Sequence, residues 1–282
     1  MYDKFLESIC FEAQKRNLKS STYTAYCNAV GYFLKSVNKE ASELSSDDVD
    51  TFLSSKRLDG ISPRTYNYYH SSIRFFFRYV LKLNWDDEDI PRMKLDYSLP
   101  TVLTKDEINA IIENTPNLKH KAIIATMYSS GLRVSEVAHL HYDDISRKSM
   151  TIHVRNTKNR RDRYTILSKR NLDLLTEYWF KCGRPMDILF PSAWTGSYLD
   201  KCSINQFFKK SALRCGITRR VSSHSCRHSF ASHLLEAGVD VKYIQVLLGH
   251  VDPRSTDIYL HVSNKTLLGI RSPFDAPEGD KS

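Results

Sequence analysis

A break in the sequence pattern between residues 84 and 100 constrains the fold of this chain more than any other feature. This stretch is acidic, has no regular apolar spacing and contains Pro91 and Pro100. Proline fixes φ and lacks a backbone N–H, so a continuous helix or strand does not run through such a segment. At 282 residues the chain can form two domains with separate cores. The pattern predicts a helical domain over residues 1–95, a linker over 96–102, a second domain over 103–272 and a flexible tail over 273–282.

The first ninety residues predict four helices. Apolar residues recur at helical spacing in 2–16 and again in 21–37. Ser45 or Ser46 can cap a third helix that runs to about residue 58. Pro63 suits the first turn of a fourth helix, which extends to about residue 83.

The segment from 61 to 83 combines cations with aromatic rings and contains no acid. Such a helix suits a DNA groove, where cations meet phosphates and rings meet sugars or bases. Alternatively, the rings are buried in a core and the cations reach past them to solvent. The first interpretation makes four side chains candidate DNA contacts: Arg64, Arg74, Arg78 and Lys82.

The second half predicts more helices and one short β-structure. Thr104 and Glu107 form a capping-box pattern at the start of its first helix. Apolar residues alternate on both sides of a polar stretch in residues 148–167, which predicts a β-hairpin. Further helices are predicted at about 104–114, 117–129, 168–182, 203–215, 225–237 and 240–248, with a short helix at Arg133. The fold class is therefore mostly α with a small β-hairpin or sheet (α+β).

The positive charge is concentrated in the second half. The chain has 41 Lys and Arg against 32 Asp and Glu, and the whole excess of +9 lies in residues 100–282. This distribution suits a polyanionic partner, although net charge alone is equally consistent with ordinary solubility. Residues 147–163 have seven basic side chains and one acid. Four of them are further candidate DNA contacts: Arg155, Arg160, Arg161 and Arg163.

Six side chains form an inventory suited to attack on a phosphodiester without a metal. A phenol can act as nucleophile, arginines can hold the phosphate, and a lysine or histidine can move protons. Part of the set is tightly spaced, because H-x-x-R is followed by L-L-G-H and then by a tyrosine nine residues further on. The six candidates are Arg133, Lys158, His224, Arg227, His250 and Tyr259.

Each of these residues has a simpler interpretation when taken alone. A histidine at a helix end is usually a cap or a surface residue, and a tyrosine usually packs in a core. His224 and His228 have the spacing of a metal pair, but no carboxylate or cysteine lies in ligand register with them. The joint spacing therefore favours a metal-free site, and we expect neither metal nor cofactor.

The N-terminal residues, the apolar runs and the cysteines indicate where in the cell the protein works. The first residues lack the basic and apolar regions of a signal peptide, and no apolar run reaches about 20 residues. Six scattered cysteines without C-x-x-C pairs are typical of reduced thiols. We therefore expect a cytoplasmic, nucleoid-associated protein without a membrane partner.

Two segments together resemble a known family. Residues 131–140 read G-L-R-V-S-E-V-A-H-L, and residues 224–262 contain H-S-C-R, L-L-G-H and S-T-D-I-Y-L-H-V. They resemble the tyrosine recombinases, or phage integrase family, and above all its short Xer-type and integron or transposon members. The first half resembles the family's helical, SAM-like core-binding domain in size and pattern.

The resemblance implies a role for each of the six residues. Arg133 and Arg227 match the paired phosphate-binding arginines, and Lys158 matches the hairpin lysine. His224 and His250 match the two histidines, and Tyr259 matches the nucleophile. The implied activity is site-specific cleavage and rejoining of DNA strands through a 3′-phosphotyrosyl link, in integration, excision or resolution, without ATP.

The resemblance also implies partners. These are duplex DNA with inverted-repeat half-sites and three further copies of the chain, with the segment at 263–270 docked in trans. An accessory protein or a second, paired recombinase could also take part. Two alternatives remain open at this stage: a type IB topoisomerase, which nicks and reseals one strand, and a DNA-binding regulator without catalytic activity.

Overall fold

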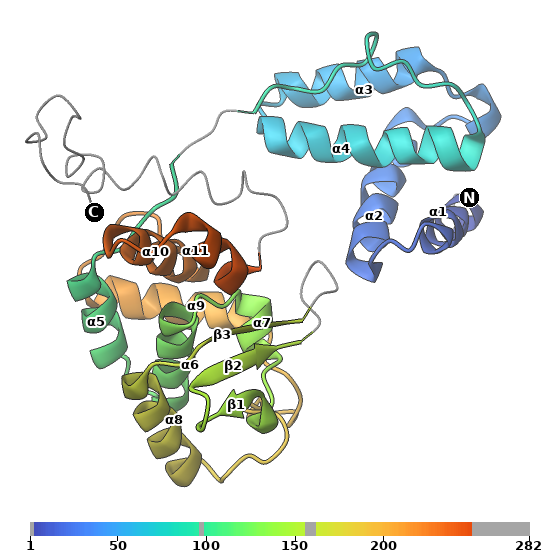
Figure 1. Cartoon of the computed structure of the whole chain (residues 1–282). Helices are drawn as coiled ribbons and strands as arrows, with labels where there is room; N and C mark the ends of the chain where they lie inside the picture. The colour runs from blue at the N-terminus through green and yellow to red at the C-terminus, as the bar shows by residue number, and fades with distance from the viewer. Residues whose placement is uncertain (1–2, 96–98, 156–161, 250–282) are drawn as a thin grey trace, which may run out of the picture. The chain divides into compact units, whose positions relative to one another are not determined.

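The computed structural model describes residues 3–95, 99–155 and 162–249. The chain separates into two compact units, residues 1–97 and 98–282 (Figure 1). None of the described helices is long and apolar enough to cross a membrane.

The first unit is helical, as its sequence predicts. Its elements are α1 (Asp3–Lys15), α2 (Ser20–Val37), η1 (Ala41–Glu43), α3 (Ser46–Leu58), α4 (Pro63–Phe75) and η2 (Phe76–Leu81). Ser45 caps α3 and forms a capping box with Asp48, while Ser62 caps α4 just before Pro63. The capping side chains accept hydrogen bonds from backbone N–H groups that have no partner within their own helices.

The fourth predicted helix changes type along its length. It is α-helical through Phe75 and then π-helical in η2. The rings of residues 75–77 are buried in the core of this unit, together with Phe33 and Ile73. The core interpretation is therefore confirmed for these phenylalanines.

The cations of the same helix lie at the surface of the unit. Arg64, Arg78 and Lys82 are exposed, and Arg74 is partly exposed. A carboxylate from beyond the helix reaches Arg74, since Asp87 Oδ2 lies 2.6 Å from its Nη2. The helix therefore faces the core with its phenylalanine rings and solvent with its charges.

The second unit combines helices with a small sheet. Its helices are α5 (Lys105–Glu113), α6 (Leu118–Ser129), α7 (Val134–Ala138), η3 (Tyr142–Asp144), α8 (Lys169–Lys181), α9 (Lys201–Arg214), α10 (Ser223–Glu236) and α11 (Val241–Leu248). Thr104 and Glu107 form the predicted capping box at α5. Helix α6 is buried along residues 122–127, where α5, α8 and α10 pack around it.

The predicted hairpin forms two strands of a three-stranded antiparallel sheet. Strand β2 (Thr151–Val154) pairs with β3 (Arg163–Ile166), with Ile152 opposite Thr165. A short additional strand, β1 (Ile145–Ser146), pairs with the other edge of β2. Ile152, Val154 and Thr165 are buried, so one face of the hairpin joins the core.

Helices α10 and α11 end as their sequence predicts. Gly238 has a φ of +84° and Gly249 a φ of +63°, the left-handed conformation in which glycine commonly follows a helix. Asp240 caps α11, and Ile244 and Leu248 are buried. The two helices lie side by side in Figure 1 and contact one another.

Candidate active site

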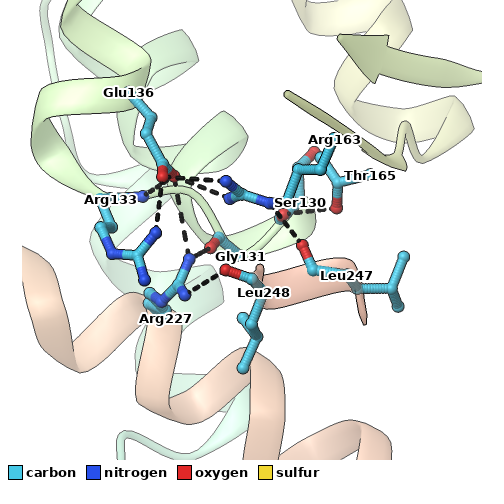
Figure 2. A network of polar contacts seen from close by, with 9 residues as sticks. All are labelled: Ser130, Gly131, Arg133, Glu136, Arg163, Thr165, Arg227, Leu247 and Leu248. Carbon is cyan, nitrogen blue, oxygen red and sulfur yellow. Dashed lines mark hydrogen bonds and ion pairs between the residues drawn. The ribbon is translucent and has the colours of Figure 1, made fainter. Parts of the chain in front are cut away.

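The carboxylate of Glu136 lies at the centre of a network of arginines (Figure 2). Glu136 is in the first turn of α7 and is 7% exposed. One of its oxygens, Oε2, accepts the backbone N–H of Arg133 at 2.8 Å, which secures the start of the helix. A carboxylate at this position also lies at the favourable, positive end of a helix. The short sequence from 133 to 136 thus provides both a cation and the anion that orients it.

Arg133 directs part of its guanidinium toward Glu136. Its Nη1 donates to Oε1 at 2.7 Å, and its side chain is 19% exposed. The helix cap and this bond together restrict the side chain while leaving part of it at the surface. Such a partly exposed, oriented guanidinium is suited to bind an oxyanion.

Arg227 is more deeply buried and joins three segments. It lies in the second turn of α10 and is 4% exposed. Its Nη1 donates to the carbonyl oxygen of Gly131 at 2.7 Å, and its Nη2 donates to that of Leu248. Its Nη1 also lies 3.8 Å from Oε2 of Glu136. The structure therefore brings Arg227 and Arg133 to the same carboxylate, as Figure 2 shows.

Arg163, which the sequence predicts as a DNA contact, is also part of this network. It donates from Nη1 and Nη2 to the two oxygens of Glu136 at 2.9 and 2.8 Å, and from Nε to the carbonyl oxygen of Leu247 at 2.8 Å. Only 9% of the residue is exposed. All three side-chain nitrogens donate hydrogen bonds to groups inside the protein.

The charges around Glu136 determine its protonation. Burial by itself would raise the pKa of this carboxyl group. The hydrogen bonds and charge of Arg163 oppose that effect, with the backbone N–H of Arg133 and the charge of Arg227, and the pKa falls to about 2. Glu136 is therefore an anion at neutral pH and balances part of the arginine charge.

His224 lies at the start of α10, where its side chain is exposed. Partial desolvation, followed by the charges of Arg227 and Arg133, lowers its pKa below the ordinary 6.5. His224 precedes Arg227 by three residues on α10, a spacing that places both side chains on one face of the helix. A neutral imidazole at this place can accept a proton at neutral pH.

His228 lies one turn further along α10. Desolvation, followed by the charges of His224 and Arg227, lowers its pKa to about 4. Among the described residues, no group of three or more His, Cys, Asp or Glu could hold a metal ion.

The other predicted residues of the second unit lie outside the arginine network or outside the described residues. Arg155, at the end of β2, is about half exposed, and its Nε donates to Asp144 at 2.6 Å. Lys158, Arg160, Arg161, His250 and Tyr259 lie outside the described residues. Strand β2 ends at Val154, β3 begins at Arg163, and α11 ends at Leu248, two residues before His250.

Sequence analysis missed Glu136 as a site residue. One signal was present, because a glutamate three residues after a helix start is the capping-box position. It was used for Thr104 and Glu107 but not for Arg133 and Glu136. The contact of Arg163 with the same carboxylate spans 27 positions, and no local pattern indicates it.

Two family models match this chain. The model described as the phage integrase family matches residues 101–266, and the phage integrase N-terminal SAM-like domain matches residues 1–87. A tyrosine recombinase of Thermosipho africanus is 32% identical over 93% of this chain and 96% of its own length. The tyrosine recombinase XerD of Listeria innocua is 30% identical over 97% of this chain and 98% of its own.

Solved structures share the fold. The XerH site-specific recombinase bound to difH substrate, in a pre-cleavage complex, has a TM-score of 0.72 at 22% identity and covers 93% of this chain and 81% of its own. A lambda integrase dimer bound to a COC′ core site has a TM-score of 0.72 at 16% identity, covering 90% and 96%.

The two family-model matches and the named relatives define a tyrosine-type site-specific DNA recombinase. The chain belongs to the phage integrase family. Its activity is the site-specific cleavage and rejoining of DNA, and the topoisomerase and regulator alternatives are not favoured.

Proposed function

We propose that Tyr259 attacks the scissile phosphate in this activity and expels a 5′-hydroxyl, leaving a 3′-phosphotyrosyl link. The observation that carries the proposal is the arrangement of Arg133 and Arg227 around Glu136, with His224 one turn before Arg227 on the same helix. Two arginines held in this way can stabilise the extra negative charge of the pentacoordinate phosphorus. The link retains the energy of the broken bond, so rejoining needs no ATP.

The other groups have complementary roles in this proposal. A phenol has an ordinary pKa of about 10 and needs a base at neutral pH. The lowered pKa of His224 fits that base. Lys158 protonates the leaving 5′-oxygen, and His250 donates a hydrogen bond to a phosphate oxygen. No step calls for a metal or a cofactor.

A nicked substrate tests the nucleophile. When the cut releases a short fragment, rejoining fails and the covalent complex accumulates. We expect the protein to form this complex and Tyr259→Phe to form none, with DNA affinity within a few-fold of wild type. Tyr243→Phe is the matched control, because Tyr243 is an exposed tyrosine of α11. An adduct with the Tyr259 variant would assign the nucleophile to another residue.

The DNA partner is proposed to be a duplex with inverted-repeat half-sites. The linker at 96–102 would allow the domains at 1–95 and 103–272 to contact one duplex together. Exposed Arg64, Arg78 and Lys82 support contact by the first unit, and half-exposed Arg155 supports contact by the sheet. An accessory protein or a paired recombinase, and location in the cytoplasm at the nucleoid, are part of the same proposal.

The active assembly is proposed to be a tetramer. Two DNA sites present four strands, and each protomer carries one Tyr259, so recombination needs four protomers. The apolar residues of segment 263–270 (Leu267, Leu268 and Ile270) would dock on a neighbouring subunit. Truncation after Val262 should leave half-site binding intact and abolish the tetramer on full sites in gel-shift and sizing experiments. Normal tetramers from the truncated chain would refute the docking.

A further inference from the structure

Arg163 contacts two helices that are far apart in the sequence, α7 and α11. It is the first residue of β3, and only Asp162 separates it from the stretch 156–161 that contains Lys158. Its guanidinium binds both oxygens of Glu136 in α7 and the carbonyl oxygen of Leu247 in α11. Figure 2 shows the side chain between these two groups. The buried guanidinium of Arg163 thus links three elements: β3, α7 and α11.

The contact with Glu136 also reaches Arg133. Oε1 accepts both from Nη1 of Arg163, at 2.9 Å, and from Nη1 of Arg133, at 2.7 Å. Oε2 accepts from Nη2 of Arg163 and from the backbone N–H of Arg133, both at 2.8 Å. A shift of the carboxylate therefore moves both the side chain and the helix start of Arg133. Arg163 contributes two of these four hydrogen bonds to the Glu136 carboxylate.

The contact with α11 is tight as well. Gly249 has a φ of +63°, and a Cβ atom at this position would lie 2.8 Å from Cδ of Arg163. The helix end therefore approaches the arginine more closely than any residue with a side chain could. Arg163 and Arg227 bind consecutive carbonyl groups, those of Leu247 and Leu248. Together they hold the turn that leads into position 250.

We propose that Arg163 is a positioning residue for DNA cleavage, which orients Arg133 through Glu136 and holds the end of α11 that precedes His250. This inference rests on the proposed function of Arg133 and His250. Arg163 does not contact the DNA in this role. It acts by keeping separate catalytic segments in register, and a small misplacement of a catalytic group is enough to lower a rate strongly.

The competing explanation is a buried ion pair that serves stability alone. Under that explanation, a variant that folds well cleaves well. Under ours, cleavage falls even when folding and DNA binding are preserved. Lysine separates the two, because it keeps the positive charge but cannot form the two-pronged contact with a carboxylate and reach Leu247 at the same time.

The decisive measurement is single-turnover cleavage of the nicked substrate at saturating protein, with Kd and Tm for each variant. We expect Arg163→Lys to bind DNA within about three-fold of wild type and to cleave at least about thirty-fold more slowly at 20 °C. Arg170→Lys is the matched exposed control, since Arg170 pairs with Glu113 on the surface. It should cleave at the wild-type rate.

A second control variant is chosen to lower Tm as Arg163→Lys does, without touching the arginine network. Ile111→Val removes one methyl group from the core of the same unit and lies outside the arginine network. Measured well below its Tm, it should cleave as wild type does, even where its Tm falls as far as that of Arg163→Lys. A full cleavage rate in Arg163→Lys, or equal slowing in Ile111→Val, would overturn the positioning role.

Arg163→Met extends the series by removing the charge. If it folds, it should cleave no faster than the lysine variant. If it does not fold, the lysine variant decides the question. Absence of adduct with the wild-type protein would refute the proposed nucleophilic mechanism, whereas a normal wild-type adduct with an unaffected Arg163→Lys would refute only the positioning role.

Discussion

Arginines are used differently in the two units of this molecule. In the first unit they lie at the surface, as Arg64 and Arg78 do, or form a partly exposed pair, as Arg74 does with Asp87. The second unit has exposed arginines too, such as Arg170, but Arg163 and Arg227 are buried there, and both contact Glu136, as Arg133 does. A surface charge retains its water and is screened by salt. A buried charge is held by fixed partners, and it can act on a substrate without reorganisation.

The comparison teaches that residue type and net charge do not distinguish these uses. Arg78 and Arg163 are each followed directly by a tyrosine, yet Arg78 is exposed and Arg163 has every side-chain nitrogen hydrogen-bonded. We therefore expect variants of the buried set to change rate or stability strongly. Variants of the exposed set should change salt-dependent affinity weakly.

The largest effect is expected for the arginines of the site. Arg133→Ala and Arg227→Ala should each raise the barrier to cleavage by about 3 kcal/mol, because each removes a fixed donor to the transition state. Arg227→Ala should also lower Tm, because the buried carbonyl groups of Gly131 and Leu248 lose their donor. Single-turnover cleavage and thermal melting measure the two effects. Arg170→Ala provides the control, and an unchanged rate in either variant would remove that residue from the phosphate site.

The next effect concerns a glycine beside the arginine network. Gly131 has a φ of +62°, and a Cβ atom would lie 2.5 Å from the ring of Phe230. Gly131→Ala should destabilise the second unit by about 2 to 4 kcal/mol, from left-handed strain and crowding together. Gly183 has a φ of +84° with nothing within 4 Å, so Gly183→Ala tests strain alone. Denaturant unfolding that gives equal losses would show that crowding at Gly131 is unimportant.

Acid should weaken the second unit through His228. Its pKa falls from 6.5 to about 4 on folding, so the unfolded state binds the proton more readily. The stabilisation is complete above pH 6.5 and is lost as pH falls toward 4, by at most about 3 kcal/mol. Glu136 adds a second loss at lower pH, between 4.5 and about 2.

Unfolding at pH 7 and pH 5 measures the contribution of His228. His228→Asn should show a smaller difference in stability between the two pH values than wild type does. His153→Asn serves as the comparison, because His153 lies on the partly exposed face of β2. An identical pH dependence in His228→Asn and wild type would exclude His228 as the source.

The smallest effect is expected in the first unit. Arg78→Glu should weaken binding to a half-site modestly and reduce the slope of log affinity against log salt by about 1, as one phosphate contact is lost. Arg74→Glu should act similarly but also place a second acid beside Asp87. Arg57→Glu, on α3, is the comparison for general charge. Unchanged affinity and slope in Arg78→Glu would leave the helix at 63–81 as a core element alone.

Local patterns were sufficient for most of the fold. Capping residues such as Thr104 and Asp240, the helix-ending Gly238 and Gly249, and the alternation around 148–167 each act within a few residues. Their effects depend on backbone geometry and hydrogen bonds between near neighbours, which the sequence displays directly. The third strand, β1, was missed because two residues carry too little alternation to recognise.

The sequence also determined the family and supplied the candidate catalytic residues, because H-x-x-R and L-L-G-H with a following tyrosine are distinctive spacings. Only the tertiary structure decided how the cations are used. The contacts of Arg163 with Glu136 and Leu247 span 27 and 84 positions, and those of Arg227 span 96 and 21. Whether an arginine is a surface charge or a guanidinium held by buried hydrogen bonds depends on its burial and on the position of its partners. These properties arise only when distant segments pack together.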